Sequence, residues 1–116
     1  MGQNIVSEKS FEFAVRIVNV YKYLTQEHKE YVMSKQLLRC GTSIGANVSE
    51  AQRGQSKADS RAKMNIALKE ANESDYWLRL LFRTNFLDET QFNSLESDIR
   101  EVISLLTAIC KTSDEK

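Results

Sequence analysis

Hydrophobic residues recur along this chain at three- and four-residue steps, the spacing that places them on one face of an α-helix. Four such segments are separated by short polar breaks, and the sequence has no proline and only four glycines. We therefore expect an all-α fold, a single domain over residues 1–116 with helices at about 7–28, 34–53, 57–85 and 89–112. Helices of this length joined by short loops form an up-down-up-down antiparallel four-helix bundle.

Polar residues mark the expected starts of three helices. Ser7 is the expected N-cap of the first. Ser56 with Asp59, and Asp88 with Gln91, have the three-residue spacing of a capping box, which predicts the starts of the third and fourth helices. The fourth helix carries the most regular apolar stripe, which consists of Phe92, Leu95, Ile99, Val102, Leu106 and Ile109.

The second helix contains several residues that weaken helices, and each glycine costs about 0.5–1 kcal/mol relative to alanine. Gly41 and Gly45 are four residues apart, so they would let another helix approach closely. The stripe expected to face the core is Leu37, Gly41, Ile44, Val48 and Ala51. A polar ridge follows one flank of this stripe and consists of Gln36, Arg39, Ser43, Asn47 and Glu50.

The first helix carries one stripe of Phe11, Ala14, Val18 and Tyr21 beside Phe13, Ile17 and Leu24. The third and fourth helices carry more apolar surface than one bundle face needs, and the fourth adds Ile103, Leu105 and Cys110 beyond its main stripe. The third has an apolar arc about twice as wide as the ~100° stripe of an ordinary bundle helix. This width predicts that the third helix packs on two sides, and a homo-oligomer in which each subunit offers a second apolar face is the simplest explanation.

Three carboxylates lie within or beside this arc, at Glu70, Glu73 and Asp75. An isolated buried charge is very unfavourable, so these groups should be paired or protonated. The natural partners on the second helix are Arg39, Ser43 and Asn47, reached either within one subunit or across an interface.

Composition and local motifs argue against several function classes. The chain has no apolar run near the roughly 20 residues of a membrane helix and no signal-peptide pattern, so we expect a cytoplasmic protein that does not enter membranes. Cys40 and Cys110 fall on apolar stripes and should be buried, reduced residues. With His28 as the only histidine and no phosphate-binding loop, we predict no catalytic residues, no metal, no cofactor and no enzyme activity.

Charge is unevenly distributed although the formal net charge is zero. Residues 34–63 hold six basic and two acidic residues, a net charge of +4, whereas residues 85–116 hold three basic and seven acidic residues, a net charge of −4. An oligomer would repeat the basic region around its axis, where it would attract nucleic acid. The residues of this candidate nucleic-acid-binding region are Lys35, Arg39, Arg53, Lys57, Arg61 and Lys63.

Two segments, SKQLLRCGTSIGANVSEAQRGQS and NIALKEANESDYWLRLL, resemble the four-helix-bundle proteins encoded in intervening sequences of bacterial 23S rRNA genes. A related branch contains the accessory variability determinant of diversity-generating retroelements. The resemblance covers nearly the whole chain and implies a bacterial, barrel-like homopentamer with a role beside RNA, or beside a reverse transcriptase and its template. The family's motif positions carry over as Gln36, Leu37, Arg39, Ser43, Asn47 and Glu50 in the second helix and Glu70, Glu73, Tyr76 and Trp77 in the third.

Two positions depart from the family's pattern. Many relatives have a basic residue where this chain has Leu38 and a proline where it has Gly45, and the first difference thins the basic surface. Our interpretation is therefore a non-enzymatic, homo-oligomeric scaffold or adaptor. The alternative is an RNA- or DNA-binding accessory factor whose oligomer presents a ring of lysine and arginine.

Overall fold

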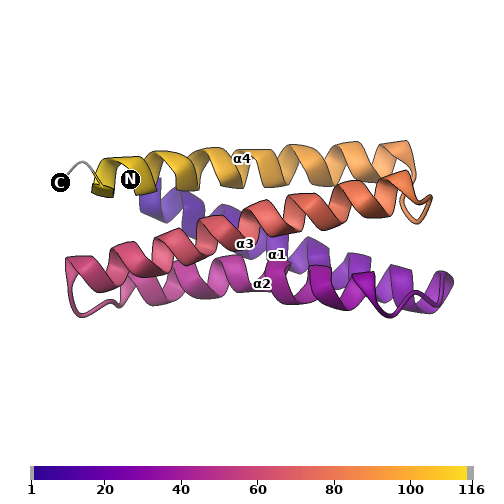
Figure 1. Ribbon diagram of the computed structural model, residues 1–116, viewed down its shortest axis with the longest axis horizontal. Coiled ribbons are helices and arrows are strands. Elements are labelled where there is room, and N and C mark those ends of the chain that lie inside the picture. Colours follow the sequence, from indigo (N-terminus) through magenta and orange to yellow (C-terminus); the bar gives the residue numbers. More distant parts are fainter. Residues whose placement is uncertain (1, 115–116) are drawn as a thin grey trace.

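Four helices account for nearly all of the chain. The computed structural model describes residues 2–114, which form α1 (Gly2–Glu27), α2 (Met33–Gln52), α3 (Lys57–Arg83) and α4 (Glu89–Asp114), with no strand among them. Consecutive helices run in opposite directions, so the two ends of the chain lie at the same end of an elongated bundle (Figure 1). Each helix packs on the next, and α1 also packs on α4. The prediction of an all-α fold with four helices is confirmed.

The predicted helix starts at α3 and α4 are confirmed by their hydrogen bonds. The Asp88 N–H donates to Gln91 Oε1 over 2.9 Å, and the Gln91 N–H donates to Asp88 Oδ1 over 2.7 Å, which completes the capping box. At α3, the Asp59 N–H donates to Ser56 Oγ over 3.0 Å. The return bond at α3 differs from the expected one, because Asp59 Oδ2 accepts from the N–H of Gln55 instead of Ser56.

The prediction that Ser7 caps α1 is wrong, because the helix begins five residues earlier, at Gly2. Val6 is fully buried and continues the core-facing stripe of α1 by one more turn toward the N-terminus. Burial of this side chain favours helix through Ser7, whose carbonyl oxygen accepts a hydrogen bond from the Ser10 hydroxyl over 3.2 Å.

Glu30 caps the start of α2, although the sequence pattern predicted that this residue lies in the loop before the helix. Its carboxylate accepts hydrogen bonds from the backbone N–H groups of Val32, Met33 and Ser34 over 3.1, 2.9 and 2.7 Å. Burial alone would raise the pKa of Glu30, but these hydrogen bonds outweigh it and lower the pKa below its ordinary value. A charged acceptor at the positive end of α2 thus satisfies three otherwise unpaired donors.

The core is built from one stripe of each helix, and α1 contributes only one of its two. The core residues include Phe13, Ile17 and Leu24 of α1, Leu37, Ile44 and Val48 of α2, Met64, Leu78 and Leu81 of α3, and Leu95, Ile99 and Leu106 of α4. In the other stripe of α1, Phe11 and Val18 are exposed. The predicted core stripes of α2 and α4 are confirmed.

The glycines of α2 lie where α1 crosses it closely. A β-carbon added to Gly41 would lie 2.9 Å from Cγ2 of Ile17, and one added to Gly45 would lie 3.4 Å from the backbone oxygen of Ser10. The predicted close approach at these two positions is confirmed, and the neighbouring helix is α1.

The wide apolar arc of α3 is used largely inside the subunit. Because α3 packs on both α2 and α4, Leu68, Trp77 and other flanking residues are partly buried against the core. Among the large apolar side chains described on α3, Ile66 and Tyr76 are the exposed ones. A second subunit is therefore not needed to explain the width of this arc, and the larger exposed apolar surface lies on α1.

Candidate functional site

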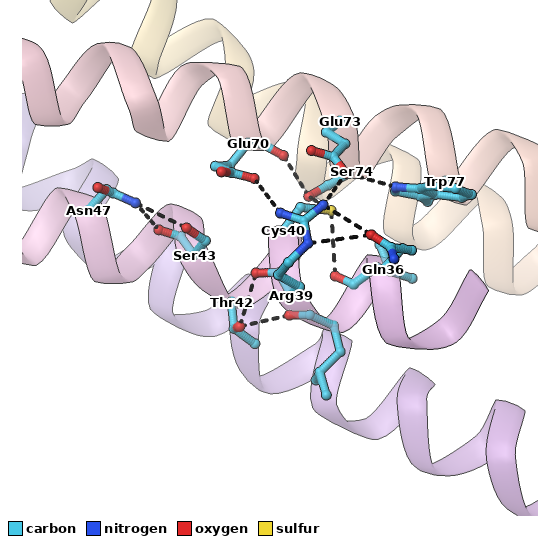
Figure 2. A network of polar contacts seen from close by, with 12 residues as sticks. Gln36, Arg39, Cys40, Thr42, Ser43, Asn47, Glu70, Glu73, Ser74 and Trp77 are labelled. Atoms are coloured by element: carbon cyan, nitrogen blue, oxygen red, sulfur yellow. Dashed lines mark hydrogen bonds and ion pairs between the residues drawn. The ribbon is translucent and has the colours of Figure 1, made fainter. Parts of the chain in front are cut away.

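Arg39 of α2 is the centre of a polar network that joins α2 to α3 (Figure 2). Its Nη1 lies 3.4 Å from Oε1 of Glu70, and its Nη2 contacts Oε2 of Glu73. Gln36 Oε1 accepts hydrogen bonds from Arg39 Nη2 and Nε over 3.2 and 3.4 Å. A single guanidinium therefore holds two carboxylates and one amide, a task for which its fixed fork of donors is suited.

The two carboxylates are well shielded from solvent. The Glu70 side chain is 15% exposed and that of Glu73 is 31% exposed. Glu73 Oε2 also accepts a hydrogen bond from the indole N–H of Trp77 over 3.1 Å, and the Tyr76 ring packs edge-on against Trp77. Trp77 is partly buried against the core cluster.

A second layer of the network lies beneath Arg39. The Ser74 hydroxyl donates to the Glu70 carbonyl oxygen over 2.8 Å and lies 3.3 Å from Sγ of Cys40. Cys40 and Ser74 are both fully buried, and burial raises the pKa of the Cys40 thiol. The prediction that Cys40 and Cys110 are buried and not disulfide-bonded is confirmed. A buried thiol with a raised pKa is a poor nucleophile.

Two residues of the predicted polar ridge do not reach the acids within the subunit. The Asn47 side-chain amide donates to the backbone oxygen and to Oγ of Ser43 over 2.9 and 3.0 Å, so these two residues satisfy each other. Glu50 pairs with Lys63 of α3 over 3.1 Å. Of the three partners expected for Glu70 and Glu73, Arg39 is the one that the subunit brings to them.

The sequence pattern missed one buried acid, Glu96 of α4. It lies between α4 and α3, where burial and the neighbouring Asp75 raise its pKa to about 7. Its Oε2 accepts from Nε of Arg100 over 3.0 Å, and Asp75 pairs with Arg79 over 3.3 Å. The available signal was that Glu96 follows Phe92 by four residues and precedes Ile103 by seven, so it shares a face with two partly buried residues.

The candidate nucleic-acid-binding residues do not form one patch. Arg53 and Lys63 line a cleft at the α2–α3 turn together with Glu50 and Asp59. Lys57 and Arg61 follow in the first turns of α3. Lys35 is in the first turn of α2 and lies 18 positions before Arg53, which corresponds to about 27 Å along a helix. Arg39 and Lys63 are also neutralised by carboxylates, so the positive charge available at the turn comes from Arg53, Lys57 and Arg61.

Residues 2–114 give little support to a metal site, a catalytic histidine or a membrane-spanning helix. No group of three or more His, Cys, Asp or Glu side chains in this range is placed to hold a metal ion. His28 Nε2 lies 3.0 Å from the Tyr23 hydroxyl, and its ring packs edge-on against Phe86. None of the described helices is both long and apolar enough to cross a membrane.

Comparison with known proteins matches the chain to one family model and to solved structures. A family model described as "23S rRNA-intervening sequence protein" matches residues 2–108. The chain is also similar to a crystal structure of a protein with unknown function from the S23 ribosomal protein family of Bacteroides thetaiotaomicron VPI-5482. The two are 58% identical with a TM-score of 0.93, and the match covers 96% of this chain and 99% of the other. No curated protein matches the chain.

Proposed function

Because this chain belongs to the family of 23S rRNA-intervening sequence proteins, we propose that it acts as a non-enzymatic, cytoplasmic scaffold or adaptor that works as a homo-oligomer. The observation that carries this proposal is an apolar surface on α1 that the bundle itself does not cover. The Arg39 network supports it as well, because the family's motif residues there pair with each other and join α2 to α3.

The exposed surface, which we call the α1 stripe, consists of Phe11, Val15 and Val18. Phe11 is 66% exposed, and the three- and four-residue spacing places all three side chains along one side of the helix. The core-facing residues of α1 point to a different side, so the α1 stripe is a second apolar face. Contiguous exposed apolar residues of this kind mark protein–protein interfaces.

The charge distribution favours another copy of the chain as the partner. The basic excess of residues 34–63 lies on α2 and the start of α3, and the acidic excess of residues 85–116 lies mainly on α4. Since α2 and α4 occupy opposite corners of the bundle, the basic edge of one subunit would meet the acidic edge of the next. Repeated head-to-tail contact forms a ring where the rotation between neighbours closes, and the family resemblance implies such a ring, a barrel-like pentamer.

Replacing Phe11 with Glu is expected to weaken self-association by at least about tenfold, because it places a charge at the centre of an apolar interface. Light scattering coupled to size exclusion should show a wild-type particle near five subunit masses and a smaller particle for the variant. Circular dichroism should be unchanged, since Phe11 is exposed in the subunit.

The matched control is Asn72→Glu, which introduces the same charge at an exposed polar position of α3, a helix that does not contact α1 within the described part of the chain. It should assemble like the wild type. A wild-type protein that stays monomeric at high concentration, or a Phe11→Glu variant that assembles normally, would remove the α1 stripe as an interface.

Binding of RNA or DNA is the second candidate function, and one observation favours it. Among the described residues, Arg53, Lys57 and Arg61 form no ion pair, and they gather where α2 turns into α3. If this candidate is correct, labelled structured RNA, single-stranded RNA or duplex DNA should bind with micromolar affinity that falls steeply as salt rises. Alanine at Arg53 or Lys57 should weaken binding, whereas alanine at the distant Lys35 should have less effect. The absence of binding at low salt would eliminate this candidate.

A further inference from the structure

The interface between α3 and α4 contains two neighbouring carboxyl groups, those of Asp75 and Glu96, which interact with each other. Oδ1 of Asp75 and Oε1 of Glu96 are both buried, and neither accepts a hydrogen bond from any donor among the described residues. A carboxylate can only accept hydrogen bonds, so contact between two of these groups requires a proton on one of them.

The other two oxygens of the pair are already occupied. Asp75 Oδ2 lies 3.3 Å from Nη2 of Arg79, and Glu96 Oε2 accepts from Nε of Arg100 over 3.0 Å. Each arginine comes from the same helix as its partner, four residues later, and each is largely exposed. Oδ1 of Asp75 and Oε1 of Glu96 are therefore the two buried oxygens that lack a donor.

We propose that Asp75 and Glu96 form a proton-binding site in which one shared proton links α3 to α4, and that losing this proton loosens α4 from the bundle. With the proton present, the buried pair carries one negative charge and an internal hydrogen bond. Without it, two like charges face each other at a site where the Glu96 side chain is only 9% exposed.

The surrounding charges do not replace the proton. Arg79 and Arg100 are the charged groups on α3 and α4 that contact the pair, and solvent screens both of them. The cations of α1 and α2 that form ion pairs with α3 or α4 are bound to other carboxylates. Lys9 binds Glu101 and Arg16 binds Asp98, and Arg39 binds Glu70 and Glu73. Burial, followed by the hydrogen bond and the charge of Asp75, raises the pKa of Glu96 from 4.5 to about 7.

The direction of the pH effect follows from this raised pKa. The unfolded chain releases the Glu96 proton near its ordinary pKa of 4.5, whereas the folded protein keeps it until about 7. Between these values the folded state binds more protons, so stability falls as pH rises through this interval and then levels off. Across it, the unfolding equilibrium constant should increase on the order of 100-fold because of this site.

The test is urea unfolding of the wild type and of Glu96→Gln at one protein concentration, from about pH 5 to about pH 8. The Gln amide is uncharged and donates a hydrogen bond to Asp75 in place of the shared proton. The variant should match the wild type at the acidic end and be on the order of 100-fold harder to unfold at the alkaline end. Glu101→Gln, which removes an exposed carboxylate of α4, should keep the wild-type pH dependence.

Two measurements on the wild type are independent of any variant. Carbon NMR of the glutamate carboxyl groups should show one residue with a midpoint near neutral pH, and hydrogen exchange corrected for intrinsic rates should show α4 amides losing protection above that midpoint. The proposal is overturned if Glu96→Gln and the wild type share one pH dependence, or if every glutamate titrates near its ordinary pKa.

Discussion

Replacing Arg39 with Ala should lower the free energy of unfolding by about 2–3 kcal/mol, because it leaves two shielded carboxylates without their cation. Glu70 and Glu73 are three residues apart on α3, so without the guanidinium they repel each other as well as losing a partner. Gln36 also loses its donor. The expected loss is smaller than for a fully buried ion pair, since the Arg39 side chain is half-exposed. Urea unfolding monitored by circular dichroism measures it.

Conservative changes at the same site separate charge from geometry. Arg39→Lys keeps the charge, but a single ammonium cannot reach Glu70, Glu73 and Gln36 together, so about half of the loss should remain. Arg53→Ala, directly after the end of α2, removes an arginine without an ion pair and should change stability by less than about 0.5 kcal/mol. Adding Glu70→Gln and Glu73→Gln to Arg39→Ala should restore part of the stability, because no unpaired charge is then left. If the Arg39→Ala and Arg53→Ala proteins are equally stable, the Arg39 network contributes no more to the free energy of unfolding than an unpaired surface arginine.

Much of the fold could be predicted from the sequence where the determinants are local. The capping residues Ser56 and Asp88 bond to groups three positions away, and a spacing rule is enough to find them. The core stripe of α2 follows from periodicity alone. The pairing of Arg39 with Glu70 and Glu73 could also be anticipated in part, since acids within an apolar arc need a cation and the facing helix offers few.

The features that were missed depend on which helices meet. The two stripes of α1 are similarly hydrophobic, so periodicity cannot decide that Ile17 is buried while Val18 is exposed. The packing of α2 on α1 decides which stripe is buried, because Gly41 leaves space for the Ile17 side chain. Glu96 was overlooked for the same reason, because burial of its flank of α4 depends on the position of α3. Glu30 lies outside any apolar pattern, and its role as a cap is visible only from three backbone bonds.

Substitutions at the two glycines of α2 should have opposite effects on stability. Gly45→Ala should stabilise the protein by about 0.5 kcal/mol, because the new β-carbon makes an ordinary contact 3.4 Å from Ser10 and alanine favours helix. Gly41→Ala gains the same helix propensity but forces its β-carbon to 2.9 Å from Ile17, so it should destabilise by about 1–2 kcal/mol. Gly41→Val places two further methyl groups on the same β-carbon and should lower the free energy of unfolding by about 3 kcal/mol or more. Denaturant midpoints of the three variants measure these effects.

The cause of the Gly41 effect can be isolated by shortening the residue that it meets. The close atoms are Cγ2, Cγ1 and Cβ of Ile17, which are near the α1 backbone and cannot move aside by a change of the outer side chain alone. Ile17→Ala removes both γ-carbons and by itself should cost about 2–5 kcal/mol. Combined with Gly41→Val, it should cost at least about 1 kcal/mol less than the sum of the single changes, since the valine then fills the space that isoleucine leaves. Strict additivity would mean that Gly41 is required for a reason other than its contact with Ile17, and the close crossing of α1 and α2 would no longer explain a glycine in the middle of a helix.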